Sequence, residues 1–92
     1  MKKKYIFSLT KNAEKQLADL EKDIRKRILK KLHFFQRQED PLSSAKPLSH
    51  INAYRFRVGD YRIIVAKKDS NQLVILIVLK IGHRRDVYEN FN

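Results

Sequence analysis

Three arginines surround a predicted tight turn, where they could bind phosphate. Gly59-Asp60 is a two-residue hairpin signal, so Arg57 and Arg62 are expected to lie directly opposite each other on two strands. Arg55, two residues away, shares their face because side chains alternate along a strand. Like charges paired in this way cost roughly 0.2–1 kcal/mol. Guanidinium groups bind phosphate oxygens in two-point contacts, so the pattern favours an anion-binding face. The alternative is that the arginines extend into water at little cost.

A second basic stretch follows the last predicted strand. Gly82 lets the chain leave that strand, His83, Arg84 and Arg85 come next, and Tyr88 follows four residues after Arg84. If the strand lies beside the hairpin, this tail reaches the edge of the arginine face. The expected site then combines several guanidinium groups with one imidazole and one phenol.

This set of groups is suited to RNA cleavage by the 2′-hydroxyl of the RNA itself. That reaction needs a base at the 2′-oxygen, an acid at the leaving 5′-oxygen and cations beside the phosphate. The arginines can supply the positive charge. Of the residue types present, only histidine ordinarily titrates near neutral pH. We expect Tyr88 or His83 to act as the base and Arg84 to assist the leaving group.

The composition narrows the possible partners and cofactors. Lys and Arg number 21 and Asp and Glu number 10, so the formal net charge is 21 − 10 = +11, which indicates an anionic partner. There is no cysteine, and His33, His50 and His83 lack the spacing of metal ligands, so we expect neither a metal nor a cofactor. The longest apolar run, Leu73 to Leu79, is too short to cross a bilayer, and no secretory signal is visible. A cytoplasmic location is therefore expected.

The elements that position these residues can be read from the hydrophobic pattern. Residues 4–10 form a first strand, and Thr10 caps a helix with Ala13, Leu17 and Leu20 on one face. Asp23 is the expected cap of a second helix that ends before Pro41, and residues 39–50 form a loop. The hairpin and an apolar central strand over residues 73–80 follow. The sequence therefore predicts one α+β domain over residues 1–92, of order β-α-α-β-β-β with a short C-terminal turn or helix. Its sheet is four-stranded and mostly antiparallel, with both helices on one face.

The hairpin Y-R-F-R-V-G-D-Y-R (54–62), the apolar strand and the closing G-H-R-R-D-V-Y (82–88) resemble the RelE branch of the RelE/ParE toxin superfamily. The resemblance spans nearly the whole chain and implies the small RelE-like microbial-RNase fold. It also implies the toxin of a type II toxin–antitoxin system, a metal-independent endoribonuclease that cuts mRNA in the ribosomal A site. The implied partners are a cognate antitoxin, mRNA and the ribosome with its 16S rRNA. Operator DNA is implied only through the antitoxin complex.

The resemblance also implies roles for individual residues. Arg62 matches the arginine that stabilises the transition-state phosphate, Arg84 a tail arginine that is a phosphate ligand or general acid, and Tyr88 a tail tyrosine. His83 stands where many relatives carry His or Lys. Arg55 and Arg57 match basic strand residues that contact the substrate, and Lys46 and Arg85 are further candidate substrate-binding cations.

Two other interpretations of the sequence stay open. One is a ParE-type inhibitor of DNA gyrase, which shares the fold. The other is a catalytically inactive basic module that binds antitoxin and nucleic acid. The exposed lysines of the second helix, Lys26, Lys30 and Lys31, are candidate contacts to ribosomal RNA, although a solvated helix face explains them equally well.

Overall fold

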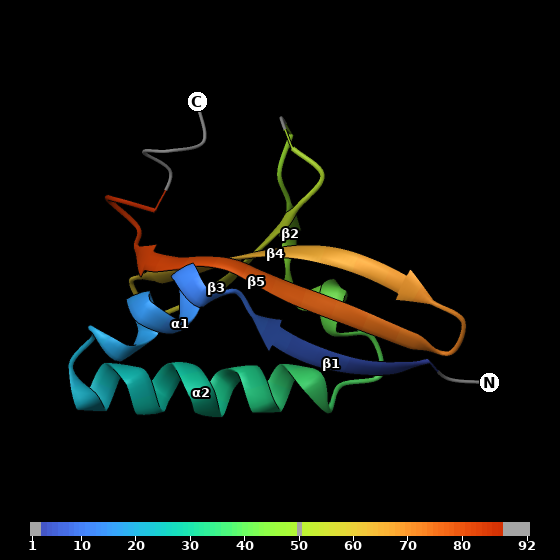
Figure 1. Cartoon of the computed structure of the whole chain (residues 1–92), viewed down its shortest axis with the longest axis horizontal. Helices are drawn as coiled ribbons and strands as arrows, with labels where there is room; N and C mark the ends of the chain where they lie inside the picture. Colours follow the sequence, from blue (N-terminus) through green and yellow to red (C-terminus); the bar gives the residue numbers. More distant parts are fainter. Residues whose placement is uncertain (1–2, 50, 88–92) are drawn as a thin grey trace.

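The computed structural model describes residues 3–49 and 51–87 of the 92-residue chain. In this part of the chain, two helices cover one face of a five-stranded sheet (Figure 1). The elements are β1 (Lys4–Leu9), α1 (Lys11–Ala18), α2 (Lys22–Gln36), the 3-10 turn η1 (Pro41–Ser44), β2 (Lys46–Pro47), β3 (Tyr54–Val58), β4 (Tyr61–Ser70) and β5 (Leu73–His83). No helix of these residues has the length and apolar character needed to span a membrane.

The strand order is β1-β5-β4-β3-β2, with β1 parallel to β5 and the other neighbours antiparallel. The predicted α+β class, the order of elements and the mostly antiparallel sheet are confirmed. The described sheet has one more strand than predicted, because Lys46 and Pro47 pair with Arg55 and Tyr54. The loop pattern gave no sign of β2, but proline is acceptable on an edge strand, where it need not donate to a ladder.

The start of α1 follows the prediction, whereas the start of α2 does not. The hydroxyl of Thr10 accepts a hydrogen bond from the backbone N–H of Ala13 at 3.1 Å, which satisfies one free amide of the first turn. Asp23 was predicted to cap the second helix, but α2 begins earlier, at Lys22, after Glu21. Asp23 therefore lies inside the first turn, where its charge interacts favourably with the helix dipole.

The main core lies between the helices and the sheet. Ile28, Leu32 and Phe35 of α2 are buried against the strands. Phe56 of β3 is fully buried, and its ring lies 4.6 Å from that of Phe35, centroid to centroid. Since side chains alternate along β3, burial of Phe56 directs its two arginine neighbours to the other face of the sheet.

That other face was expected to be uncovered, but a small second core lies on it. Ile64 of β4 and Val87 of the tail are fully buried, and Ala53 is nearly so. Leu48, Ile51 and Leu79 pack against them. The segments before β3 and after β5 supply most of this cluster, and both lie on the side of the sheet away from α2 (Figure 1). We call this side the outer face.

Candidate functional site

Cationic residues form two neighbouring rows on the outer face. In one row, Arg57 of β3 pairs with Arg62 of β4, which pairs with Gly82 of β5. The second row crosses four strands and consists, in order, of Lys46, Arg55, Ile64 and Lys80. Neighbouring strands lie roughly 5 Å apart and the two rows roughly 7 Å apart, which places the cations within reach of one phosphodiester segment. We call Lys46, Arg55, Arg57, Arg62 and Lys80 the outer cationic cluster.

Arg62 is held in place by the hairpin that carries it. Its side chain was expected on an open surface, yet the residue is only 8% exposed. Its Nη1 donates to the carbonyl oxygens of Gly59 at 2.9 Å and Tyr61 at 3.0 Å. Arg57, its partner on β3, is exposed. The predicted arginine pair therefore exists, but one member is anchored to the hairpin turn and the other faces solvent.

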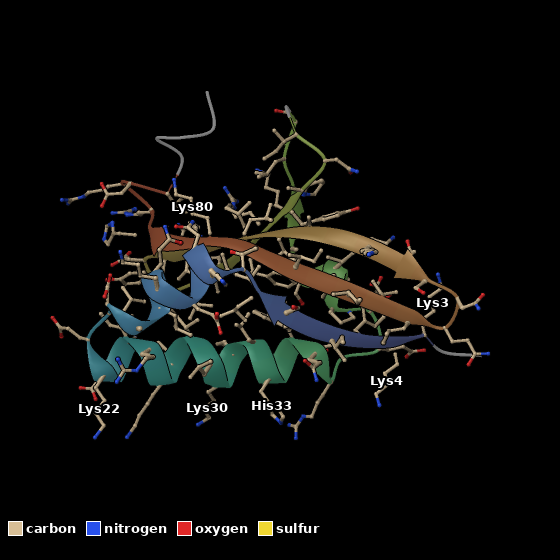
Figure 2. The ribbon with its side chains drawn as sticks, viewed as in Figure 1. Lys3, Lys4, Lys22, Lys30, His33 and Lys80 are labelled. Carbon is tan, nitrogen blue, oxygen red and sulfur yellow. The ribbon has the colours of Figure 1, made fainter. Side chains whose placement is uncertain are left out.

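Lys80 belongs to the outer cationic cluster, although no role was predicted for it. It is 9% exposed, its Nζ is buried, and it lies directly opposite Ile64. Figure 2 shows it on the side of the sheet away from α2. A β-bulge lets Ile64 pair with Lys80 while Val65 pairs with Val78, and this places Lys80 on the outer face. The available signal was a lysine at the end of an otherwise apolar strand.

The tail begins beside the hairpin turn. The backbone N–H of Arg84 donates to the carbonyl of Asp60 at 2.8 Å. The side-chain Nε of Arg84 lies 3.8 Å from the Asp60 carboxylate. Gly82 was predicted to end the last strand, but β5 continues to His83. A Cβ at Gly82 would lie 3.6 Å from the Cβ of Val87, which is an ordinary contact distance, so the tail folds back closely over the strand at this point. Arg84 and Arg85 are exposed.

His83 lies on the opposite face from the outer cationic cluster. It pairs with Tyr61, their ring centroids are 5.5 Å apart, and Tyr61 packs against the helix-side core. Its Nδ1 accepts a hydrogen bond from the backbone N–H of Arg85 at 3.2 Å, so in the neutral ring the proton resides on Nε2. The expected association of His83 with the arginines is not found. Tyr88, the other predicted base, lies outside the described residues.

The three lysines predicted to contact ribosomal RNA lie on another surface. Lys26, Lys30 and Lys31 are exposed on α2, and Figure 2 shows Lys30 pointing away from the sheet. Lys30 and Lys31 border a shallow pocket of about 290 Å³, which is also lined by Arg27 and Phe34. The Nζ of Lys31 lies 5.3 Å from the centre of the Phe34 ring. We call Lys26, Arg27, Lys30, Lys31 and Phe34 the helix-face patch.

Residues 7–88 match a family model described as the ParE toxin of type II toxin–antitoxin systems. The chain belongs to the ParE toxin family. The ParE-family chain is thus a toxin of a type II toxin–antitoxin system, within the RelE/ParE superfamily that the sequence pattern indicated. A search of the curated proteins found no match.

Solved structures of toxin–antitoxin complexes contain chains similar to this ParE-family toxin. A chain of the RelBE2 complex from Mycobacterium tuberculosis is 25% identical, with a TM-score of 0.73 over 87% of this chain and 98% of that one. A chain of the RelB–RelE complex from Methanococcus jannaschii is 26% identical, with a TM-score of 0.64 over 91% and 98%. A chain of the Escherichia coli RelBE complex, at 18% identity and a TM-score of 0.67 over 86% and 95%, shares the fold.

Proposed function

We propose that this toxin is a metal-independent endoribonuclease that cleaves mRNA in the ribosomal A site. The observation that carries the proposal is the outer cationic cluster, in which Arg57 and Arg62 are paired and Lys80 is buried beside them. The turn carbonyls hold Arg62, but stability gains nothing from a second arginine, Arg57, placed directly opposite it, because the two like charges repel each other. A phosphate that enters between them relieves that repulsion and accepts hydrogen bonds from both.

In the proposed reaction, the 2′-oxygen attacks the adjacent phosphorus and the 5′-oxygen leaves. Negative charge accumulates on the phosphate oxygens in the transition state, and cations held in place beforehand stabilise it without reorganisation. Arg62 suits this role because two turn carbonyls fix its guanidinium. Arg55, Arg57 and Lys46 hold the flanking backbone, and Arg85 extends the binding surface. The buried Lys80 adds positive charge beneath them.

The proton transfers are assigned to the tail. Arg84 is the proposed donor to the leaving 5′-oxygen, since the tail turn holds it beside the hairpin. Tyr88 is the better candidate for the base, because His83 lies on the helix side and the lone pair of its Nδ1 is already used. Tyrosine and arginine side chains ordinarily titrate far above neutral pH, so they are a weak base and a weak acid for this reaction. Much of the rate must therefore come from orientation of the substrate.

The proposed partners follow from charge and from the relatives. Solved relatives are toxin–antitoxin complexes, which supports an antitoxin that binds this toxin and inhibits it. Operator DNA is then reached only through that complex. The helix-face patch is the proposed contact with 16S rRNA, so the toxin can deliver its opposite face to the messenger. A cytoplasmic location is part of the proposal, because messenger RNA, ribosomes and operator DNA are found there.

The decisive experiment is induced expression of the wild type and of Arg62→Ala and Arg62→Lys, with messengers mapped by primer extension. Wild type is expected to cut translated messages at A-site codons, and both variants are expected to lose cutting. Arg62→Lys is included because it keeps the positive charge but loses the planar guanidinium group that makes two-point contacts with phosphate. Purified variants are checked by circular dichroism, since a side chain anchored to the turn also supports folding. Normal cutting by folded Arg62→Ala contradicts the proposal.

Inhibition of DNA gyrase is the second candidate function, and the match to the ParE family model favours it. The same induction separates the two activities. DNA breaks with intact messages support the gyrase inhibitor, whereas cut messages with intact DNA support the nuclease. Continued growth with both intact indicates an inactive basic module that only binds antitoxin and nucleic acid.

A further inference from the structure

The β3–β4 turn holds two predicted site arginines through different atoms. The carbonyl of Gly59 accepts from Nη1 of Arg62 at 2.9 Å. The carbonyl of Asp60 accepts from the backbone N–H of Arg84 at 2.8 Å, and its carboxylate oxygen lies 3.8 Å from Nε of Arg84. Asp60 thus adds a negative charge at the edge of a strongly positive surface. Neither folding of the turn nor phosphate binding requires a carboxylate at this position, since glycine, asparagine and aspartate all suit such turns.

We propose that the Asp60 carboxylate is an internal counterion of Arg84 that is exchanged for an RNA phosphate when the substrate binds. This inference deepens the proposed function and depends on it. The Asp60 carboxylate lies 3.8 Å from Nε of Arg84, which is an ion-pair distance, so it competes with a phosphate for this edge of the guanidinium group. It also repels a phosphate that approaches within the Debye length, about 8 Å at physiological ionic strength.

The geometry makes this exchange easy. The side chains of Arg84 and Asp60 are 56% and 67% exposed, and an ion pair so exposed contributes at most about 1 kcal/mol. Breaking the pair therefore costs little. The backbone hydrogen bond between the same two residues does not depend on the carboxylate, so it keeps Arg84 beside the turn while its side chain changes partner. Asp60 is thus a selectivity device: it prevents weak anions from occupying Arg84 and yields to a phosphodiester bound by the whole outer cationic cluster.

The test measures binding of a fluorescent, fully 2′-O-methylated RNA, which cannot be cut by 2′-hydroxyl attack, to the full-length protein. Fluorescence anisotropy gives the Kd for wild type, Asp60→Asn and the matched control Asp86→Asn. Asp86 is exposed, carries the same charge in the tail and has no ion pair within residues 3–49 and 51–87. Both variants gain the same formal charge, so a difference between them reports the contact with Arg84.

Asp60→Asn is expected to tighten binding roughly two- to five-fold beyond Asp86→Asn at low salt, with the difference shrinking at high salt. In an Arg84→Gln background, the two variants are expected to behave alike. The inference is overturned if Asp60→Asn matches Asp86→Asn while Arg84 is present, if it weakens binding, or if its gain survives Arg84→Gln. Wild type that fails to bind the RNA, or binds no better than Arg62→Ala, contradicts the proposed function instead.

Discussion

Arg57 and Arg62 lie directly opposite each other on β3 and β4, yet Arg57 is exposed and Arg62 is buried. The difference arises because Arg62 turns back to the hairpin, where Nη1 donates to two carbonyl groups. One guanidinium is therefore part of the scaffold as well as of the outer cationic cluster, whereas its partner contributes charge alone. The two arginines should differ accordingly in what they contribute to stability.

Arg62→Ala is expected to lower the free energy of unfolding by roughly 1–3 kcal/mol, since it leaves two turn carbonyls without their charged donor. Arg57→Ala is expected to change it by no more than about 0.5 kcal/mol in the destabilising direction, because removal of a like-charge neighbour offsets the lost packing. Urea denaturation of the two variants beside wild type measures both. Equal losses would show that the anchoring of Arg62 contributes nothing.

The two glycines should respond differently to the same substitution. Gly59 has φ +59°, so Gly59→Ala places a side chain in the left-handed region and is expected to cost roughly 1–2 kcal/mol. Gly82 has no such backbone requirement, and a methyl group there meets Val87 at ordinary contact distance. Gly82→Ala is therefore expected to cost less than Gly59→Ala in thermal or urea unfolding. The reverse order would contradict this account of the turn.

Val87 ties the tail to the sheet. It is fully buried in the second cluster, so Val87→Ala is expected to destabilise the protein by roughly 1–3 kcal/mol. Because the same contact positions the tail, RNA binding is expected to fall toward that of Arg84→Gln. Asp86→Ala, at the exposed neighbouring position, serves as the control for both measurements. Unchanged RNA binding by a folded Val87→Ala protein would separate the tail from the site.

The ring of His83 should occupy one tautomer. Its Nδ1 accepts from the backbone N–H of Arg85, so the neutral imidazole is expected to carry its proton on Nε2. Long-range nitrogen–proton correlation NMR identifies the protonated nitrogen. Arg85→Pro removes the donor and is expected to increase the share of the other tautomer. A neutral ring protonated mainly on Nδ1 in wild type would exclude this hydrogen bond.

The contribution of Asp69 to stability should decrease in acid. Asp69 lies near the turn between β4 and β5. The hydrogen bond from Lys3 holds the pKa of the Asp69 carboxyl below its ordinary value, and Lys67 acts in the same direction. A pKa lower in the folded than in the unfolded state gives stability that is present above the unfolded-state pKa. That stability is lost as the pH falls through the folded-state pKa. Asp69→Asn is therefore expected to be slightly less stable than wild type at neutral pH and equally stable in strong acid, as measured by thermal unfolding. The exposed site and added salt should keep the difference small.

The sequence was most informative where one local signal determines the geometry. Gly59-Asp60 sets the register of the hairpin, and the register alone places Arg57 against Arg62. Thr10 is a similar case, because a cap depends only on residues within the same turn.

Features that depend on distant packing could not be predicted in this way. The role of Lys80 depends on a bulge that no local residue type announced. The face of the sheet on which His83 lies depends on the continuation of β5 beyond Gly82, where the strand was predicted to end. Val87 packs on the outer face beside Gly82, and a single valine in a charged tail carries no periodic pattern that would predict this.

The parallel pairing of β1 with β5 has a consequence for synthesis of the toxin. β1 has no other neighbour in the described sheet, so the strand translated first waits for the strand translated last before it can join. A nascent chain that stops before Leu73 lacks Lys80 and Arg84 and cannot bring β1 into the sheet. An interrupted round of translation before Leu73 thus releases a fragment in which β1 has no partner strand, so the five-stranded sheet can form only after β5 has been synthesised.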